Sequence, residues 1–241
     1  MPGQSEVLSI VRMLRPQRSQ FRKCRIGSLG DGGYVLPEDL VGISRVLSIG
    51  VGSEVSFDMH FAAAGVPVHQ YDPTVDGPPL QHANFDFHPT AWAFADGERT
   101  ASLGGMIRAH GFDQRDDALL KFDTEGAEWE SLRSVTPDLL KHFRIIVCEL
   151  HGFNSLHNPA FLQDVWQAMN LLTRNHTVVH LHANNCCGIS LVEGVPVPAV
   201  LELTLLRNDR SDFGPCHEPI PGPLDYPSMP DRPDLVLRPY A

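Results

Sequence analysis

The stretch RVLSIGVGSEVSFDMHF, residues 45–61, decides the fold class. Its first six residues form an apolar run closed by glycine, which predicts a short buried strand. The following SEVSFDMHFAAAG, residues 53–65, predicts a helix because Phe57, Phe61 and Ala64 fall on one face. Strand, glycine turn and helix in this order are typical of an α/β protein with a nucleotide-type ligand at the turn.

The turn itself does not identify that ligand. Gly50 and Gly52 let the backbone turn tightly and approach a bound molecule. The third glycine of a dinucleotide loop is missing, because Val55 stands in its place. A turn that only joins the strand to the helix explains the same residues equally well.

Strand-like and helix-like patterns alternate along the rest of the chain, which predicts a mostly parallel sheet covered on both faces. The helix at 159–175 is the clearest, with an expected apolar stripe of Phe161, Leu162, Val165, Trp166, Met169 and Leu172. Further helices are expected at 6–14 and 100–111, and strands at 67–72, 83–87, 118–123, 144–150, 176–183 and 199–206.

One domain is expected over residues 1–241. It comprises an N-terminal helix and lid-like segment (1–44), an α/β core (45–208) and a proline-rich surface wrap (209–241). The net charge of −10 argues against a nucleic-acid partner. Five cysteines without a C-x-x-C pair favour a reducing compartment, so a cytoplasmic location is expected. No apolar run approaches the roughly 20 residues of a membrane span.

In open α/β sheets, ligands bind beyond the carboxyl ends of the strands, and polar residues occur at several predicted strand ends. Asp72 follows the glycine turn at the distance typical of an acid that binds a ribose diol, although a surface turn would also accept an acid. Asp86, Phe87 and His88 follow the third strand, where they would flank an adenine ring.

A second set of strand ends carries carboxylates and histidines. Asp123 ends a buried strand, so we expect it to point into the cleft. Glu149 and His151 share a side of their strand by its period of two, and His182 ends another strand. These four side chains would converge over one cleft. They either hold Mg²⁺ or Mn²⁺ or hydrogen-bond substrate and one another.

The ordered segments VLSIGVGSEVSFD, QYDPT, FHPTAWAFADG, LKFDTEGAEWESL and IIVCELHGF resemble FkbM-type S-adenosylmethionine-dependent methyltransferases, in the branch related to methyltransferase-like protein 24. RIGSLGDGGYVL, HLHANNC, PAVLELTLLR and PLDYPSMPDRPDL are similar to that branch too, so the likeness runs from about Cys24 to Leu237. It implies a class I methyltransferase fold: a doubly wound, seven-stranded, mostly parallel sheet. The single antiparallel strand would be AVLELTLL, residues 199–206.

The resemblance also implies where S-adenosylmethionine lies. Gly50, Gly52 and Glu54 would be near its methionine part, and Asp72 would hold the ribose. Asp86 to His88 would lie near adenine, and Asp123 would face the amino-acid end or the reaction centre.

The function expected from the residues and the resemblance together is O-methylation of a sugar hydroxyl, in a glycan or glycosylated small molecule. His151 is the expected general base, with Glu125 or His182 as alternatives, and Asp123 and Glu149 would hold the metal ion if there is one. DGGY, residues 31–34, forms either a lid or a plain β-turn. Two other functions remain open: a NAD(P)-dependent oxidoreductase, and a non-catalytic scaffold on a degenerate methyltransferase fold.

Overall fold

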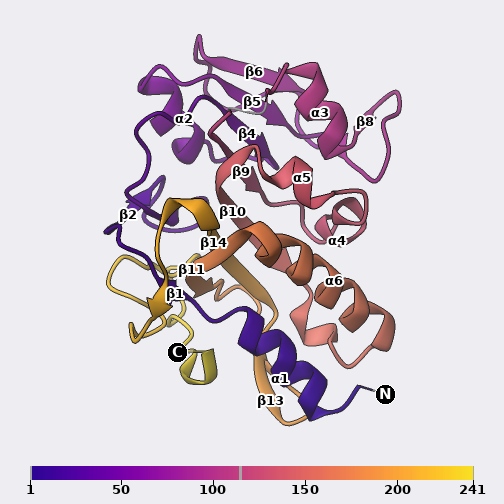
Figure 1. Cartoon of the computed structure of the whole chain (residues 1–241), viewed down its shortest axis with the longest axis vertical. Helices are drawn as coiled ribbons and strands as arrows, with labels where there is room; N and C mark the ends of the chain where they lie inside the picture. The colour runs from indigo at the N-terminus through magenta and orange to yellow at the C-terminus, as the bar shows by residue number, and fades with distance from the viewer. Residues whose placement is uncertain (1, 114–115, 241) are drawn as a thin grey trace.

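A seven-stranded sheet in the order β11-β14-β10-β9-β4-β5-β6 forms the centre of the computed structural model, which describes residues 2–113 and 116–240 (Figure 1). β14 runs antiparallel to both of its neighbours, and the other neighbouring pairs are parallel. The expected class I topology is therefore confirmed, including its one antiparallel strand. The strands of this sheet are β4 (Val46–Ile49), β5 (Val68–Tyr71), β6 (Phe85–His88), β9 (Ala118–Phe122), β10 (Phe143–His151), β11 (His176–Ala183) and β14 (Val200–Arg207).

Helices and short strand pairs surround this sheet. The α-helices are α1 (Gln4–Met13), α2 (Ser56–Ala63), α3 (Leu103–Ala109), α4 (Glu128–Leu132), α5 (Pro137–Leu140) and α6 (Pro159–Asn175). Short 3₁₀ turns are η1 (Phe153–Ser155), η2 (Asn208–Arg210) and η3 (Arg238–Tyr240). The remaining strands pair in twos: β1 (Gln17–Arg18) with β15 (Gly214–Pro215), β2 (Lys23–Ile26) with β3 (Tyr34–Pro37), β7 (Ala91–Trp92) with β8 (Thr100–Ala101), and β12 (Ile189–Val192) with β13 (Val195–Pro198). These four pairs were not predicted from the sequence.

The central strands are buried on both faces, which is why they read as continuous apolar runs. Along β9, Leu120 and Phe122 join an apolar cluster with α1 and α3 to α6, whereas Leu119 joins a second cluster with α2 and the β2–β3 hairpin. The sheet thus separates a layer of five helices from a layer made of one helix and a hairpin (Figure 1).

α6 confirms the expected helix at 159–175 but corrects its apolar face. The Asn158 side chain caps the helix by accepting a hydrogen bond from the Ala160 amide at 3.0 Å. Val165, Met169 and Leu172 are buried as expected. Trp166 was expected in the same stripe, but it is 43% exposed and lies at the margin of the buried face.

α2 begins three residues later than expected, at Ser56 rather than at residue 53. The residues before it belong to the glycine turn, where the Glu54 carboxylate accepts a hydrogen bond from the Ser56 amide at 2.9 Å. Phe57 and Phe61 are buried as expected. Ala64 is exposed because the helix has already ended, and Ala62 takes its place in the core.

Segments near the two ends of the chain contact each other. β1 pairs with β15, and the Arg25 guanidinium donates to the carbonyl oxygens of Ser28, Gly30 and Leu224. The bond to Leu224 joins β2 to the C-terminal segment. The extent of a single domain over 1–241 stays a prediction. Within the described residues, no helix combines the length and apolar character needed to cross a bilayer.

Candidate active site

A cavity of about 370 Å³ lies at the carboxyl ends of β4, β5 and β9, the edge of the sheet where a ligand was expected. Its volume is in the range of small-molecule sites. Six of the residues singled out from the sequence line it: Gly50, Gly52, Glu54, Asp72, Asp123 and Glu125. Asp31, Gly32 and Tyr34 also line it, so the DGGY segment borders the cavity.

Glycine is favoured at positions 50 and 52 of the turn for two different physical reasons. Gly50 has φ +82°, and a Cβ there would lie 1.7 Å from the carbonyl oxygen of Asp123. Only glycine therefore lets the ends of β4 and β9 come this close. Gly52 has φ +56°, but a Cβ there would meet nothing within 4 Å, so only its backbone conformation favours glycine.

The Asp72 carboxylate holds the glycine turn in place by accepting hydrogen bonds. One carboxylate oxygen accepts from the amides of Val51 and Gly52, both at 2.8 Å. The other accepts from the Thr74 amide at 2.7 Å and from its hydroxyl at 2.6 Å. Burial alone would raise the pKa of Asp72, but these bonds lower it below its ordinary value. Since four donors already occupy this carboxylate, a ribose hydroxyl would have to replace one of them, most simply the Thr74 hydroxyl.

Lys121 is a site residue that the sequence reasoning missed. Only 5% of it is exposed, it lines the cavity, and its ammonium group donates to the carbonyl oxygen of Gly50 at 2.5 Å. A buried cation normally has a charged or strongly polar partner. The lone lysine inside the apolar run ALLKF was the available signal.

Carboxylates and His151 meet at one side of the cavity, as the strand-end argument predicted. The Nε2 atom of His151 lies 3.4 Å from Glu125, 3.6 Å from Glu149 and 3.9 Å from Asp123. The side chain of His151 is 15% exposed. His151 and Glu149 do not line the cavity themselves, but their neighbours Asp123 and Glu125 do. This arrangement presents one imidazole nitrogen to several acids at the end of two neighbouring strands.

Glu128 holds the opposite side of the His151 ring. It lies in the first turn of α4, and its side chain is fully buried. One oxygen accepts from the His151 amide at 2.7 Å and lies 3.1 Å from Nδ1; the other accepts from Gly126 and Thr124. Burial alone would lower the pKa of His151, but Glu128, Asp123 and Glu125 raise it above its ordinary value. Glu128 therefore fixes both the orientation and the basicity of the ring.

The pKa values of Asp123 and Glu149 are both raised above their ordinary values. Burial and the neighbouring Glu125 raise the pKa of Asp123 to about 6, against the opposing effect of Lys121 and His151. Burial, with Asp123 and Glu202 nearby, raises the pKa of Glu149 well above its ordinary value. One oxygen of Asp123 is buried without a hydrogen-bond partner. Ligand atoms of Asp123, Glu125 and His151 lie within 4.8 Å of one another, so this group could take up a cation or a proton.

The structure separates His182 from this group, which corrects the expected convergence of four side chains. β14 lies between β10 and β11, and His182 contacts Glu202 at 3.1 Å and Asp234 at 3.0 Å. Asp234 comes from the C-terminal segment, and the His182 side chain is only 1% exposed. Its position therefore offers no access from the cavity.

Asp86, Phe87 and His88 also lie outside the cavity lining. They belong to β6, the edge strand of the sheet, and Asp86 turns toward His69 at 3.1 Å. Ala91 and Trp92, from the segment that follows β6, line the cavity instead.

Two comparisons with known proteins are consistent with this site. The sequence model of the methyltransferase FkbM domain matches residues 37–177. A rat (Rattus norvegicus) protein described as probable methyltransferase-like protein 24 is 31% identical over 130 residues, which cover 48% of this chain and 34% of the relative. The chain therefore matches about a third of that relative's length.

Proposed function

This chain belongs to the FkbM methyltransferase family, and we propose that it is an S-adenosylmethionine-dependent O-methyltransferase acting on a sugar hydroxyl. The observation that carries the proposal is the position of His151. Its Nε2 atom lies beside a cavity formed at the glycine turn, and its Nδ1 atom is held by the buried Glu128. A base positioned in this way suits removal of a proton from a hydroxyl.

The chemistry of the cavity fits the methyl donor. When bound, S-adenosylmethionine supplies an activated methyl group on a positively charged sulfur. Asp31, Glu54, Asp123 and Glu125 line the cavity with carboxylates, and one Asp123 oxygen has no hydrogen-bond partner. Such a lining favours a cationic ligand over an anionic one. We assign Gly50, Gly52 and Glu54 to the methionine side of the donor, and Asp72 to the support of the turn.

His151 is the proposed general base. In its neutral form, Nδ1–H donates to Glu128, which leaves the lone pair on Nε2, the nitrogen beside the cavity residue Glu125. Proton uptake at Nε2 produces a cation, which Glu128 stabilises from the other side. Glu125, whose carboxylate is 88% exposed and lies 3.4 Å from Nε2, is the alternative base or the group that passes the proton to solvent.

The acceptor is proposed to be neutral and hydroxyl-rich. The same acidic lining that favours a cationic donor repels phosphorylated or carboxylated acceptors. Hydrogen bonds from sugar hydroxyls to exposed carboxylates carry no such penalty. A glycan or glycosylated small molecule meets both conditions and agrees with the family resemblance.

A divalent ion, Mg²⁺ or Mn²⁺, is a separate part of the proposal. Asp123 and Glu149 would hold it, with Glu125 and His151 beside them, and it would polarise the acceptor hydroxyl. Calorimetric titration with Mn²⁺ tests this directly. Heat of binding in the wild type that disappears in Glu149→Gln supports the site, and no heat in either protein rules it out.

Two other functions have weaker support. A NAD(P)-dependent oxidoreductase disagrees with the family to which the chain belongs. A non-catalytic scaffold would retain the fold but would show no transfer of a methyl group to any hydroxyl acceptor.

The deciding experiment is calorimetric titration with S-adenosylhomocysteine. We expect binding to the wild type, weaker binding to Asp123→Asn, and unchanged binding to the control Asp96→Asn, because Asp96 is exposed and bonded to Ser102 and Arg108. No heat and no thermal shift at millimolar ligand would refute the donor assignment. Comparison with NAD in the same assay tests the oxidoreductase alternative.

A further inference from the structure

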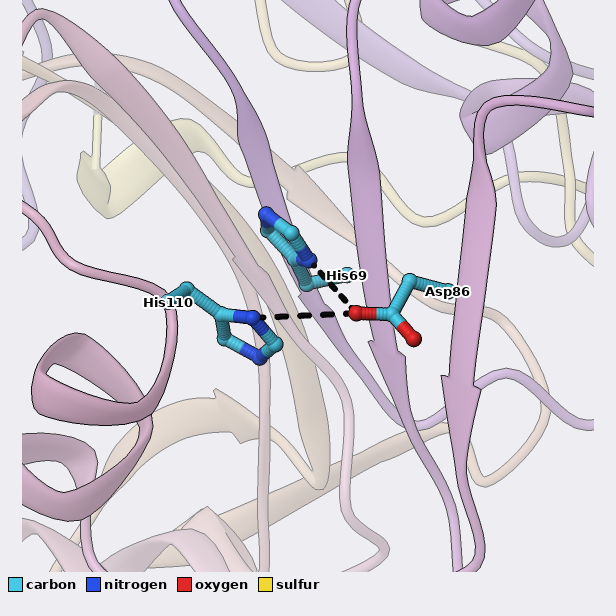
Figure 2. A group of neighbouring side chains, drawn as sticks. All are labelled: His69, Asp86 and His110. Atoms are coloured by element: carbon cyan, nitrogen blue, oxygen red, sulfur yellow. Dashed lines mark hydrogen bonds and ion pairs between the residues drawn. The ribbon is translucent and has the colours of Figure 1, made fainter.

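A second group of histidines and carboxylate lies at the other edge of the sheet, around Asp86. Figure 2 shows His69 and His110 directed at the same oxygen of Asp86. The distances from that oxygen are 3.1 Å to Nδ1 of His69 and 3.7 Å to Nδ1 of His110. The three residues come from β5, from β6 and from the residue after α3, so the group joins three separate segments.

We propose that His69, Asp86 and His110 form a metal site for Zn²⁺, distinct from the candidate active site. Ligand atoms of the three residues lie within 4.8 Å of one another. Tetrahedral Zn²⁺ with bonds of about 2.0–2.1 Å places neighbouring ligand atoms about 3.3 Å apart. The measured distances of 3.1 Å and 3.7 Å bracket that spacing.

His88 lies beside the three residues, although it is not in the group whose ligand atoms all lie within 4.8 Å of one another, and a small movement of its ring would make it a fourth donor. Its Nε2 atom lies 3.1 Å from the same Asp86 oxygen, but the angles do not form a hydrogen bond, so this buried nitrogen has no hydrogen-bond partner among the described residues. A buried nitrogen without a hydrogen bond normally carries a free-energy cost, and coordination to a metal would remove it. Three imidazoles and one carboxylate suit Zn²⁺ better than Mg²⁺ or Ca²⁺, which prefer oxygen ligands.

Tyr71 supplies the outer contact that metal-bound histidines usually have. Its hydroxyl lies 2.7 Å from Nε2 of His110, the nitrogen that faces away from Asp86. When Nε2–H donates to this hydroxyl, Nδ1 of His110 presents its lone pair to the metal. The Tyr71 ring also stacks on His88 at 4.6 Å between ring centroids. One side chain therefore orients two of the four donors.

The electrostatic surroundings of the group are mixed. The Asp86 carboxylate supplies negative charge beside the three rings, and the His110 side chain is 7% exposed. Arg45 is the opposing charge nearby. It donates to the carbonyl oxygen of His110 at 2.6 Å and lies 3.5 Å from Asp116, which neutralises it.

The site would affect the donor cavity through Tyr71, because this residue lines the cavity and contacts the histidines from the other side. It would also fasten the edge strand β6, which has a neighbour on one side only. The inference does not depend on the reaction: a metal can bind here whether or not the chain transfers a methyl group.

The test is titration of the metal-stripped full chain with Co²⁺ and, separately, with Zn²⁺. We expect Co²⁺ to produce the visible absorption of a four-coordinate site and Zn²⁺ to raise the melting temperature. Asp86→Asn, a substitution of the same shape at an exposed position, should abolish both effects. Tyr71→Phe should weaken metal affinity by about 10–100-fold, the usual cost of losing an outer contact.

Two controls keep the result specific. His157→Gln removes an exposed histidine that is not one of the proposed ligands, so this variant should bind Co²⁺ and Zn²⁺ as the wild type does. His151→Gln should keep the Co²⁺ absorption, because it alters the cavity group and leaves the edge group intact. The proposal is wrong if the wild type shows no four-coordinate Co²⁺ absorption, or if Asp86→Asn retains it.

Discussion

His151 and His182 are two histidines in matching surroundings with opposite exposure. Each lies near the end of a strand, on the same face of the sheet, and each contacts at least two carboxylates. The His151 side chain is 15% exposed beside the cavity, whereas the C-terminal segment covers His182 down to 1%. The difference teaches that coverage by a distant segment of the chain, rather than the local sequence, separates the proposed base His151 from the buried His182.

The pKa values of the two rings and their surroundings also differ. Burial alone would lower the pKa of His182, but Asp234 and Glu202 raise it to about 10, so the ring is a permanent cation at neutral pH. Burial alone would lower the pKa of His151, but Glu128, Asp123 and Glu125 raise it, and its Nε2 atom lies 3.4 Å from Glu125, which lines the cavity. His182 therefore fastens the C-terminal segment, and His151 can exchange a proton.

The largest expected effect is on turnover. His151→Gln should lower the methyl-transfer rate by about 10²–10⁴-fold, the contribution of a positioned general base. Affinity for S-adenosylhomocysteine should change little, because the glycine turn is untouched. Single-turnover rates and calorimetry on the same protein measure the two quantities. A rate equal to that of the wild type would move the base to Glu125.

His182→Gln should act on stability instead. The change leaves Glu202 and Asp234 facing each other without a cation, and breaking a buried ion pair in this way costs about 3 kcal/mol or more. Chemical denaturation measures the loss, and His157→Gln is the matched control at an exposed position. If His182→Gln lowers turnover while the unfolding free energy stays constant, the contrast between the two histidines is wrong.

The pH dependence of stability sharpens this contrast further. His182 has a folded pKa of about 10, above the ordinary value near 6.5 for an unfolded histidine. Its contribution is therefore fully present below about pH 6.5 and is lost as the pH rises toward 10. The unfolding free energy should fall by at most about 1.4 kcal/mol per pH unit in that window, and less steeply in His182→Gln. Equal slopes for the two proteins would contradict the assignment.

The smallest effect is expected from Glu128→Gln. Removing this negative charge should lower the pKa of His151, because an opposite charge in contact with the ring favours its protonated form. The rising limb of the pH–rate profile should then move to lower pH. A variant that only loses folded protein would show a lower rate at every pH, with the limb in its original place.

Much of the fold could be predicted from the sequence, because buried parallel strands and amphipathic helices leave direct patterns. Asp123 lies near Glu149 and His151 as expected, since their strands are neighbours and residues two apart share a face. The pattern did not identify Lys121, which lies inside an apolar run, or Glu128, because an acid in the first turn of a helix is common and does not indicate a buried carboxylate.

The failures at His182 and Asp86 have another physical cause. Order along the chain does not say that β14 lies between β10 and β11, nor that a segment near residue 234 covers His182. Likewise, only the folded sheet shows that Asp86 turns toward His69 and His110. Contacts between residues far apart in the sequence determine these positions, and local periodicity does not predict such contacts.

The place of β14 has a consequence for how the chain is synthesised. β10 and β11 leave the ribosome before β14, which pairs with β10 from Ile145 opposite Leu206 to His151 opposite Val200. Until β14 inserts, each of these two strands presents an unpaired edge. Unpaired edges can pair with strands of other chains, which leads to aggregation during folding. A fragment cut at residues 37–177, the span that matches the family, would retain β10 without this partner permanently.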